Sequence, residues 1–183
     1  LGSIADGMGV AIGTLPLLGA EDFGWLHGAL NDTAADFGAL MPVHALFANQ
    51  AASNPDAVAA IHGSRSMTYG ELDACANRLA HHLQATVPGS GKRIALLADR
   101  SLDMLASLLA IMKVGHTYVP LDCAHPEPRL RQTLEAAQVA AIVCDNDRME
   151  ALASAGTAVI RLDRDAEAIK ARAASAPPAV ESN

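Results

Sequence analysis

Apolar residues form two kinds of pattern along this chain, and the two patterns alternate. Short apolar runs without a helical period are typical of strands buried on both faces. Between these runs, leucine and alanine recur at steps of three and four residues, which places them on one face of a helix. The clearest case is residues 93–122, which read as strand, helix and strand. The alternation predicts an α/β fold with a mainly parallel sheet and helices on both of its faces.

The helix of this unit has a definable beginning and end. Ser101 is suited to its N-cap, because a hydroxyl can accept a hydrogen bond from an unpaired backbone N–H. Lys113 falls in the last turn, where a cation suits the negative end of the helix dipole. Gly115 follows at a place where helices often end in left-handed backbone. Pro120 limits the strand at 117–121 to a short or edge strand.

The same reasoning predicts the remaining elements. Helices are expected at 21–30, 43–53, 68–83, 126–137, 147–154 and 165–174, and strands at 57–62, 140–144 and 157–162, with a hairpin turn at Gly63-Ser64. The strongest local pattern is MTYGEL at 67–72. Thr68 and Glu71 have the spacing of a capping box, and Met67 and Leu72 have that of a hydrophobic staple. In the helix at 43–53, the expected apolar face consists of Val43, Leu46, Phe47 and Ala51.

Residues 1–41 differ from the rest, because glycine recurs every few residues and no period is sustained. Such a segment disfavours a long helix. We predict that residues 1–41 are an interdomain linker that lies along a neighbouring domain through Leu15, Leu17, Leu18, Trp25 and Leu26. Residues 42–183 are predicted to form one α/β subdomain. Since the chain begins at Leu1 and ends after a Pro-Pro stretch, we expect both ends to be cuts in a longer protein.

The composition excludes several classes of protein. Of the 183 residues, 51% are hydrophobic, so a buried core is expected. The net charge of −7 and the 3% of aromatic residues argue against a nucleic-acid partner. No apolar run is long enough to span a membrane, and no signal peptide is visible. Three widely spaced cysteines, Cys75, Cys123 and Cys144, without a CxxC pair predict reduced thiols and a cytoplasmic protein.

The candidates for a chemical site each have a simpler explanation. GSGK at 89–92 precedes a strand, whereas a phosphate loop follows one, and GMGVAIG at 7–13 has no strand before it. The seven histidines are scattered without metal-ligand spacing, including the adjacent His81 and His82. Asp122, Asp145 and Asp163 each follow a strand, where capping of the next turn is the usual role. We therefore assign no catalytic, cofactor-binding or metal-binding residue.

Two motifs nevertheless resemble one known family. MTYGEL resembles L-T/S-Y-x-E-L, the first core motif of the adenylation domains of nonribosomal peptide synthetases. MKVGHTYVPLD, residues 112–122, resembles their second, L-K-A-G-x-A-Y-V-P-L/I-D, and Pro126, Arg129 and Leu130 match the P-x-x-R-L that follows. The departures are Met67 for leucine, Val114 and Thr117 for alanine, Cys123 for proline and His125 for an aromatic residue. The resemblance covers residues 42–183, and residues 1–41 resemble the linker from a condensation domain to an adenylation domain.

This resemblance implies membership of the adenylate-forming (ANL) superfamily. Such domains use ATP and magnesium to convert an amino acid to an aminoacyl adenylate, and pass the acyl group to the phosphopantetheine thiol of a carrier protein in the biosynthesis of antibiotics and other secondary metabolites. The implied partners are the remainder of the adenylation domain, an upstream condensation domain and a downstream carrier domain. In the family the phosphate loop and the catalytic lysine lie later, so the resemblance implies that this fragment alone is inactive and binds no cofactor.

Two alternatives stay open from the sequence. The chain could come from a truncated adenylation domain that acts only as a spacer or docking scaffold between condensation and carrier domains. Outside the family, it could be a nucleotide-binding α/β module with a different chemistry, although no phosphate loop supports that interpretation.

Overall fold

The computed structural model describes residues 18–36, 38, 41–145, 147, 152–153 and 156–178. The chain divides into two compact units, residues 1–40 and residues 41–183. In the first unit, helix α2 (Ala20–His27) confirms the short helix expected at 21–30, and no residue of α2 is buried. Phe23 and Trp25 of α2 are both more than half exposed. Leu15 and Leu17 lie outside the described residues, and the linker role of residues 1–41 stays a prediction.

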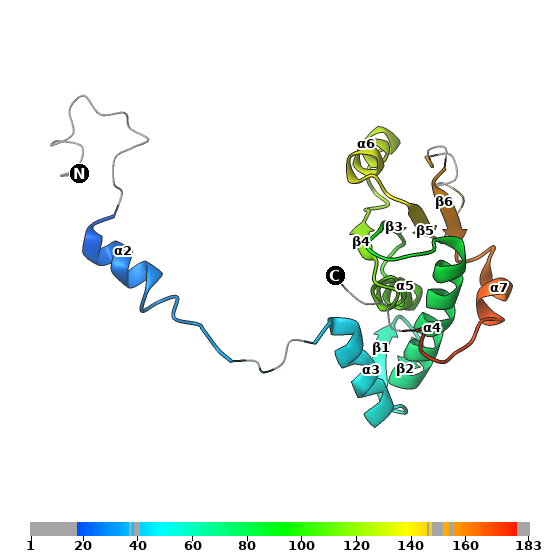
Figure 1. The fold of residues 1–183 in the computed structure, drawn as a ribbon, viewed down its shortest axis with the longest axis horizontal. Helices are drawn as coiled ribbons and strands as arrows, with labels where there is room; N and C mark the ends of the chain where they lie inside the picture. The colour runs from blue at the N-terminus through cyan, green and yellow to red at the C-terminus, as the bar shows by residue number, and fades with distance from the viewer. Residues whose placement is uncertain are drawn as a thin grey trace. The chain divides into compact units, whose positions relative to one another are not determined.

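A four-stranded parallel sheet organises the second unit (Figure 1). Its order is β4 (Thr117–Pro120), β3 (Arg93–Leu97), β5 (Ala141–Cys144) and β6 (Ala158–Arg161). Strand β3 is central, since Ile94 pairs with Tyr118 of β4 on one side and with Ala141 of β5 on the other. Strand β4 lies at the edge of this sheet, as Pro120 predicted. The parallel sheet confirms the α/β prediction.

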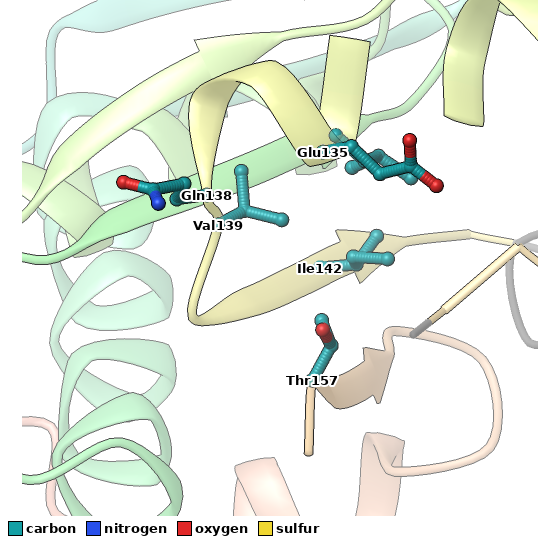
Figure 2. Close-up of a pocket in the computed structure, with 6 residues that line it drawn as sticks. Glu135, Gln138, Val139, Ile142 and Thr157 are labelled. Atoms are coloured by element: carbon teal, nitrogen blue, oxygen red, sulfur yellow. The ribbon is translucent and has the colours of Figure 1, made fainter. Parts of the chain in front are cut away.

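One face of the sheet packs against helix α6 (Glu127–Ala137). The side chains involved are buried: Ala95, Leu97, Ile142 and Cys144 from β3 and β5, and Leu130 and Leu134 from α6. Where α6 ends, the chain turns through Gln138, which has a left-handed φ of 48°. Next to this turn is a pocket of about 110 Å³, lined among others by Val139 and Ile142 (Figure 2).

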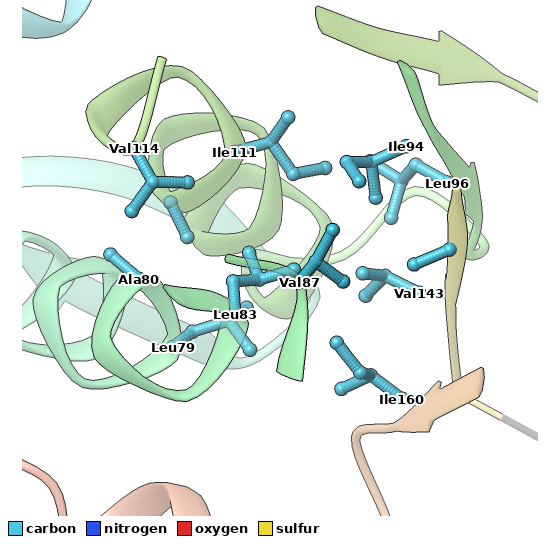
Figure 3. Close-up of a cluster of buried hydrophobic side chains, with 12 residues drawn as sticks. Leu79, Ala80, Leu83, Val87, Ile94, Leu96, Ile111, Val114, Val143 and Ile160 are labelled. Carbon is cyan, nitrogen blue, oxygen red and sulfur yellow. The ribbon is translucent and has the colours of Figure 1, made fainter. Parts of the chain in front are cut away.

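The other face of the sheet packs against helices α4 (Tyr69–Thr86) and α5 (Leu102–Lys113). Figure 3 shows side chains from the ends of both helices meeting those of the strands, and the cluster includes Leu79, Leu83, Ile111, Val114, Ile94, Leu96, Val143 and Ile160. In β3 and β5, successive residues therefore belong to opposite cores. Helices cover both faces of the sheet, as the alternation of periods predicted.

A third cluster lies on the side of α4 and α5 away from the sheet. It brings Phe47 of α3 (Val43–Ser53) and residues of the antiparallel hairpin β1 (Val58–His62) and β2 (Arg65–Thr68) against α4 and α5. The expected apolar face of α3 is partly wrong. Ala51 is buried, but Val43 and Leu46 are 66% and 54% exposed. Leu46 is offset from Phe47 by about 100° around the helix axis, because a helix has 3.6 residues per turn.

The predicted caps are present. The Thr68 hydroxyl accepts from the Glu71 N–H at 3.2 Å, and a Glu71 carboxylate oxygen accepts from the Thr68 N–H at 2.9 Å. Met67 and Leu72 belong to the same apolar cluster, as a staple requires. The Ser101 hydroxyl accepts from the Met104 N–H at 3.1 Å. Gly115 has a φ of +70°, a conformation that glycine adopts without strain.

The C-terminal part departs from expectation. Helix α7 spans Ala166–Lys170, so the expected helix at 165–174 is wrong beyond Lys170. The carbonyl of Ala174 accepts a hydrogen bond from the side chain of Asn77 on α4, a tertiary contact that local propensity cannot anticipate. The helix expected at 147–154 lies largely outside the described residues. None of the helices in the described ranges is long and apolar enough to cross a membrane.

The capping box should contribute measurably to stability. Replacing Thr68 by alanine removes the acceptor for the Glu71 N–H, and we expect the free energy of unfolding to fall by about 1 kcal/mol. Urea denaturation followed by circular dichroism measures this change. Thr86→Ala is the matched control. Thr86 is the last residue of the same helix, and its hydroxyl donates to the His82 carbonyl within the last turn. Equal losses in both variants would contradict a special role for the cap.

Candidate functional site

Aspartates follow all four strands of the parallel sheet. Asp99 comes after β3, Asp122 after β4, Asp145 after β5 and Asp163 after β6. The carboxyl ends of parallel strands share one edge, which is where open α/β sheets place ligands. The charges of Asp99, Asp122 and Asp145 all act on the Cys123 thiol, so the three carboxylates share this edge with Cys123. This edge is the first candidate for a functional site.

Two of these carboxylates are held by their own loops. Asp122 accepts from the Ala124 N–H at 2.8 Å, which closes the turn before α6. Asp163 accepts from Arg161 through both guanidinium contacts, at 3.0 and 2.5 Å. This hydrogen bonding to Arg161, with the help of the Arg164 N–H, lowers the pKa of Asp163 to about 2. Asp122 therefore has the turn-capping role that the sequence favoured, whereas Asp163 is held mainly by the preceding Arg161.

Cys123 is a poor nucleophile in this setting. Burial raises the pKa of its thiol, and the neighbouring Asp99 raises that pKa further by charge and by hydrogen bonding. Reactive cysteines need the opposite surroundings, since the thiolate is the nucleophile and is stabilised by positive charge. Burial likewise raises the pKa of the Cys75 thiol. The strand ends thus hold acidic groups beside a protonated thiol.

A cleft of about 430 Å³ lies between α4, α5, α7 and the ends of β5 and β6. Apolar side chains such as Leu79, Leu162 and Ile169 form much of its lining. Its volume is within the range usual for small-molecule sites. The charges around it are mixed: Arg78 and Lys170 are accompanied by Asp103, Asp145 and Asp163. The lining therefore selects neither an anion nor a cation.

The glycine-rich loop at 89–92 is a turn that leads into β3. Gly89 and Gly91 have φ values of +89° and +70°. The Gly91 N–H donates to the Gly115 carbonyl at 2.8 Å, and the Lys92 carbonyl accepts from the Thr117 N–H at 2.9 Å. These bonds tie the loop to the start of β4 and leave the Gly91 N–H engaged. The second glycine-rich stretch, 7–13, lies outside the described residues.

The histidines do not assemble into a metal site in the described ranges, where no group of three His, Cys, Asp or Glu side chains is placed to hold a metal ion. His116 is the most informative, because it is buried. Its Nε2 lies 3.3 Å from the Val87 carbonyl, and since a carbonyl can only accept, Nε2 carries the proton. Burial lowers the pKa of His116, and burial also lowers the pKa values of His44 and His82.

A largely buried charge pair joins the two helices that carry the sequence motifs. Lys113 is 8% exposed, and its Nζ donates to Asp73 Oδ1 at 2.9 Å. Asp73 comes directly after MTYGEL on α4, and Lys113 is the second residue of MKVGHTYVPLD on α5. Sequence reasoning placed Lys113 at the negative end of a helix and missed this pair. The available signal was the position of this charged residue between two apolar residues, Met112 and Val114.

Comparisons with known proteins agree on one relationship. A family model described as AMP-binding enzyme matches residues 47–182 of this chain. A linear gramicidin synthase from Brevibacillus parabrevis is 40% identical to it over 167 residues, which are 91% of this chain and 2% of that protein. The chain therefore spans a very small part of the length of the curated relatives that it matches.

Solved structures match the fold of the second unit. The N-terminal subdomain of NpsA from Klebsiella oxytoca superposes with a TM-score of 0.67 at 25% identity, over 78% of this chain and 35% of that chain. The nonribosomal peptide synthetase FmoA3 in its AMPPNP-bound form superposes with a TM-score of 0.72 at 27% identity, over 82% of this chain and 16% of that chain.

Breaking the buried ion pair should destabilise the fold. Lys113→Met removes the ammonium and leaves the Asp73 carboxylate partly buried without its charged partner, so we expect the free energy of unfolding to fall by about 3 kcal/mol. Urea denaturation measures this loss of free energy. Lys170→Met is the matched control, because the Lys170–Glu167 pair has the same 2.9 Å separation but is exposed. A loss in Lys113→Met no larger than the loss in Lys170→Met would contradict the importance of burial.

Stability should also depend on pH through His116. Because the folded-state pKa of His116 is lowered below its ordinary value of 6.5, the unfolded chain binds a proton between these two values and the folded chain does not. The free energy of unfolding should therefore fall as the pH is lowered through about 6.5. His116→Gln should reduce this fall, leaving the contributions of His44 and His82. Urea midpoints at about pH 7.5 and about pH 5.5 test it. An unchanged pH dependence in His116→Gln would contradict the assignment.

Proposed function

The chain belongs to the AMP-binding enzyme family, and on that premise we propose that it forms part of an adenylation domain that activates an amino acid in a nonribosomal peptide synthetase. The proposed reaction joins the amino acid carboxylate to the α-phosphate of ATP, releases pyrophosphate and gives an aminoacyl adenylate. The acyl group then passes to the phosphopantetheine thiol of a carrier domain, with release of AMP.

The observation that carries this proposal is the placement of the two sequence motifs in the fold. MTYGEL begins α4 and MKVGHTYVPLD runs from the end of α5 through β4, and the two helices pack together on one face of the sheet. The same fold is found in the nonribosomal peptide synthetase FmoA3, whose matching structure is an AMPPNP-bound form. An ATP-using parent is therefore the function that these residues support best.

Within that enzyme, the described residues would act as framework. They do not fit a nucleotide or magnesium site: the Gly91 N–H of the glycine-rich loop is engaged by Gly115, and among the described residues no three His, Cys, Asp or Glu side chains are placed to hold a metal ion. We propose that ATP, magnesium and the amino acid are held by other parts of the adenylation domain. An upstream condensation domain, joined through residues 1–41, and a downstream carrier domain are the proposed neighbours.

The alternative is a spacer. A domain that kept this packing but had lost the chemistry would hold condensation and carrier domains apart without activating any substrate. The described residues are compatible with either role, because they supply packing in both. Only turnover by the complete parent protein separates the two.

The test is ATP–pyrophosphate exchange by the longest natural chain that contains this sequence. We expect exchange that requires magnesium and rises with one amino acid of a panel. Omission of the amino acid serves as the control for background exchange. Absence of exchange with every amino acid of the panel would rule out the activating role and leave the spacer.

The 183-residue chain alone should behave differently. Because its described residues form no phosphate-binding loop, we expect no saturable ATP binding at concentrations up to about 1 mM in isothermal titration calorimetry. Circular dichroism of the same sample shows whether the chain is folded. Tight binding of ATP by the folded chain would contradict the framework role and favour a separate nucleotide-binding module.

A further inference from the structure

Three polar side chains form a stripe along α4. Asp73, Asn77 and His81 are spaced four residues apart, which places them on one side of the helix. The stripe runs beside the apolar face that includes Leu72, Ala76, Leu79 and Leu83. Asn77 is only 2% exposed, although asparagine is seldom buried in this way. A buried polar group in a helix interior calls for a structural reason.

The hydrogen bonds of this stripe connect two helices to residues 171–178, the segment after α7, which we call the tail. Asn77 Nδ2 donates to Asp73 Oδ2 at 2.8 Å and to the Ala174 carbonyl at 2.8 Å. The other oxygen of Asp73 accepts from Lys113 at 2.9 Å. Because the carboxylate and the carbonyl can only accept, the amide of Asn77 has one possible orientation. The bonds therefore run from α5 through α4 to the tail.

One turn further along α4, His81 makes a second contact with the tail. Its Nε2 lies 3.1 Å from the Ser175 carbonyl. The carbonyl has no proton to give, so the imidazole is the donor. Two consecutive carbonyls of the tail, those of Ala174 and Ser175, are thus held from successive turns of α4.

The first two residues of the tail are tied to α7, because the N–H groups of Ala171 and Arg172 donate to the Glu167 and Ile169 carbonyls, and Pro177 is partly buried. The side chains between them offer little to hold the tail in position. Residues 171–176 are all exposed, and most of them are alanine, so burial of their side chains contributes little. A segment without apolar anchors is normally free to sample many conformations. Hydrogen bonds to its carbonyls from a buried, oriented amide supply the constraint that its side chains do not.

We propose that Asn77 and His81 form a polar clasp that fixes the tail across α4, and that Asp73 and Lys113 keep Asn77 in its holding orientation. The clasp links residues 171–178 to both sequence motifs, since Asp73 follows the first and Lys113 belongs to the second. It requires neither ATP nor an amino acid, so it stands or falls independently of the proposed function.

Limited proteolysis of the 183-residue chain tests the clasp. Trypsin cleaves after Arg172, next to the held carbonyls, and after Arg129 in α6, whose opening requires the core to unfold because Leu130 is buried. In Asn77→Ala we expect cleavage after Arg172 to accelerate about fivefold, the factor that corresponds to the loss of one hydrogen bond. Cleavage after Arg129 should change much less. Mass spectrometry of the time course gives both rates.

Ser107→Ala is the matched control. Ser107 is also buried, and its hydroxyl donates to the Asp103 carbonyl within α5, without a bond to the tail. This variant should leave the rate of cleavage after Arg172 at the wild-type value. His81→Ala is the second test variant. Because His81 is only partly buried, its replacement should not prevent folding. It should also accelerate cleavage after Arg172.

The role of Lys113 is tested by combination. If Lys113 acts through Asn77, the double variant Lys113→Met with Asn77→Ala should show the same ratio of cleavage after Arg172 to cleavage after Arg129 as Asn77→Ala alone. The clasp would be refuted by an unchanged rate after Arg172 in both Asn77→Ala and His81→Ala. It would equally be refuted by rates that rise in parallel after Arg172 and Arg129, which would mean global destabilisation.

Discussion

The constraint on which this structure depends is the burial of strand β3 on both faces. Its side chains alternate between the core under α4 and α5 and the core under α6, and its two edges pair with β4 and β5. No residue of Ile94–Leu97 is more than 4% exposed. A polar side chain anywhere in that run would lose its hydration without gaining a partner. Both cores therefore share this strand.

Local signals in the sequence predict most of the elements. Thr68, Ser101 and Gly115 each fix a helix end through bonds within a few residues, and such bonds do not depend on the rest of the fold. The apolar runs predict β3 and β5 for the same reason. What the sequence could not show depends on partners distant along the chain. Lys113 meets Asp73 from 40 residues away. Helix α7 ends at Lys170, and Asn77 donates a hydrogen bond to the Ala174 carbonyl in the segment that follows.

In the candidate site, too, the sequence could predict what depends on nearby residues and could not predict what depends on distant ones. Asp122 and Asp163 could be interpreted from sequence, because their acceptor roles are met by Ala124 and Arg161 within two residues. The gathering of Asp99 and Asp145 around Cys123 needed the order of the strands, since β5 lies beside β3 and not beside β4. The family's two motifs prove to be packing elements in this unit: one begins α4, the other ends α5, and their neighbouring charges meet in the buried pair.

The Asp73–Lys113 pair has a consequence for recombining such proteins. Its carboxylate directly follows the first motif and its ammonium lies in the second, and Asn77, which also bonds Asp73, lies between them in sequence. A chimera joined anywhere between residues 78 and 112 takes the carboxylate from one parent and the ammonium from the other. Unless both parents have this pairing, one charge is buried alone. Junctions placed before residue 73 or after residue 113 keep both charges in one inherited piece.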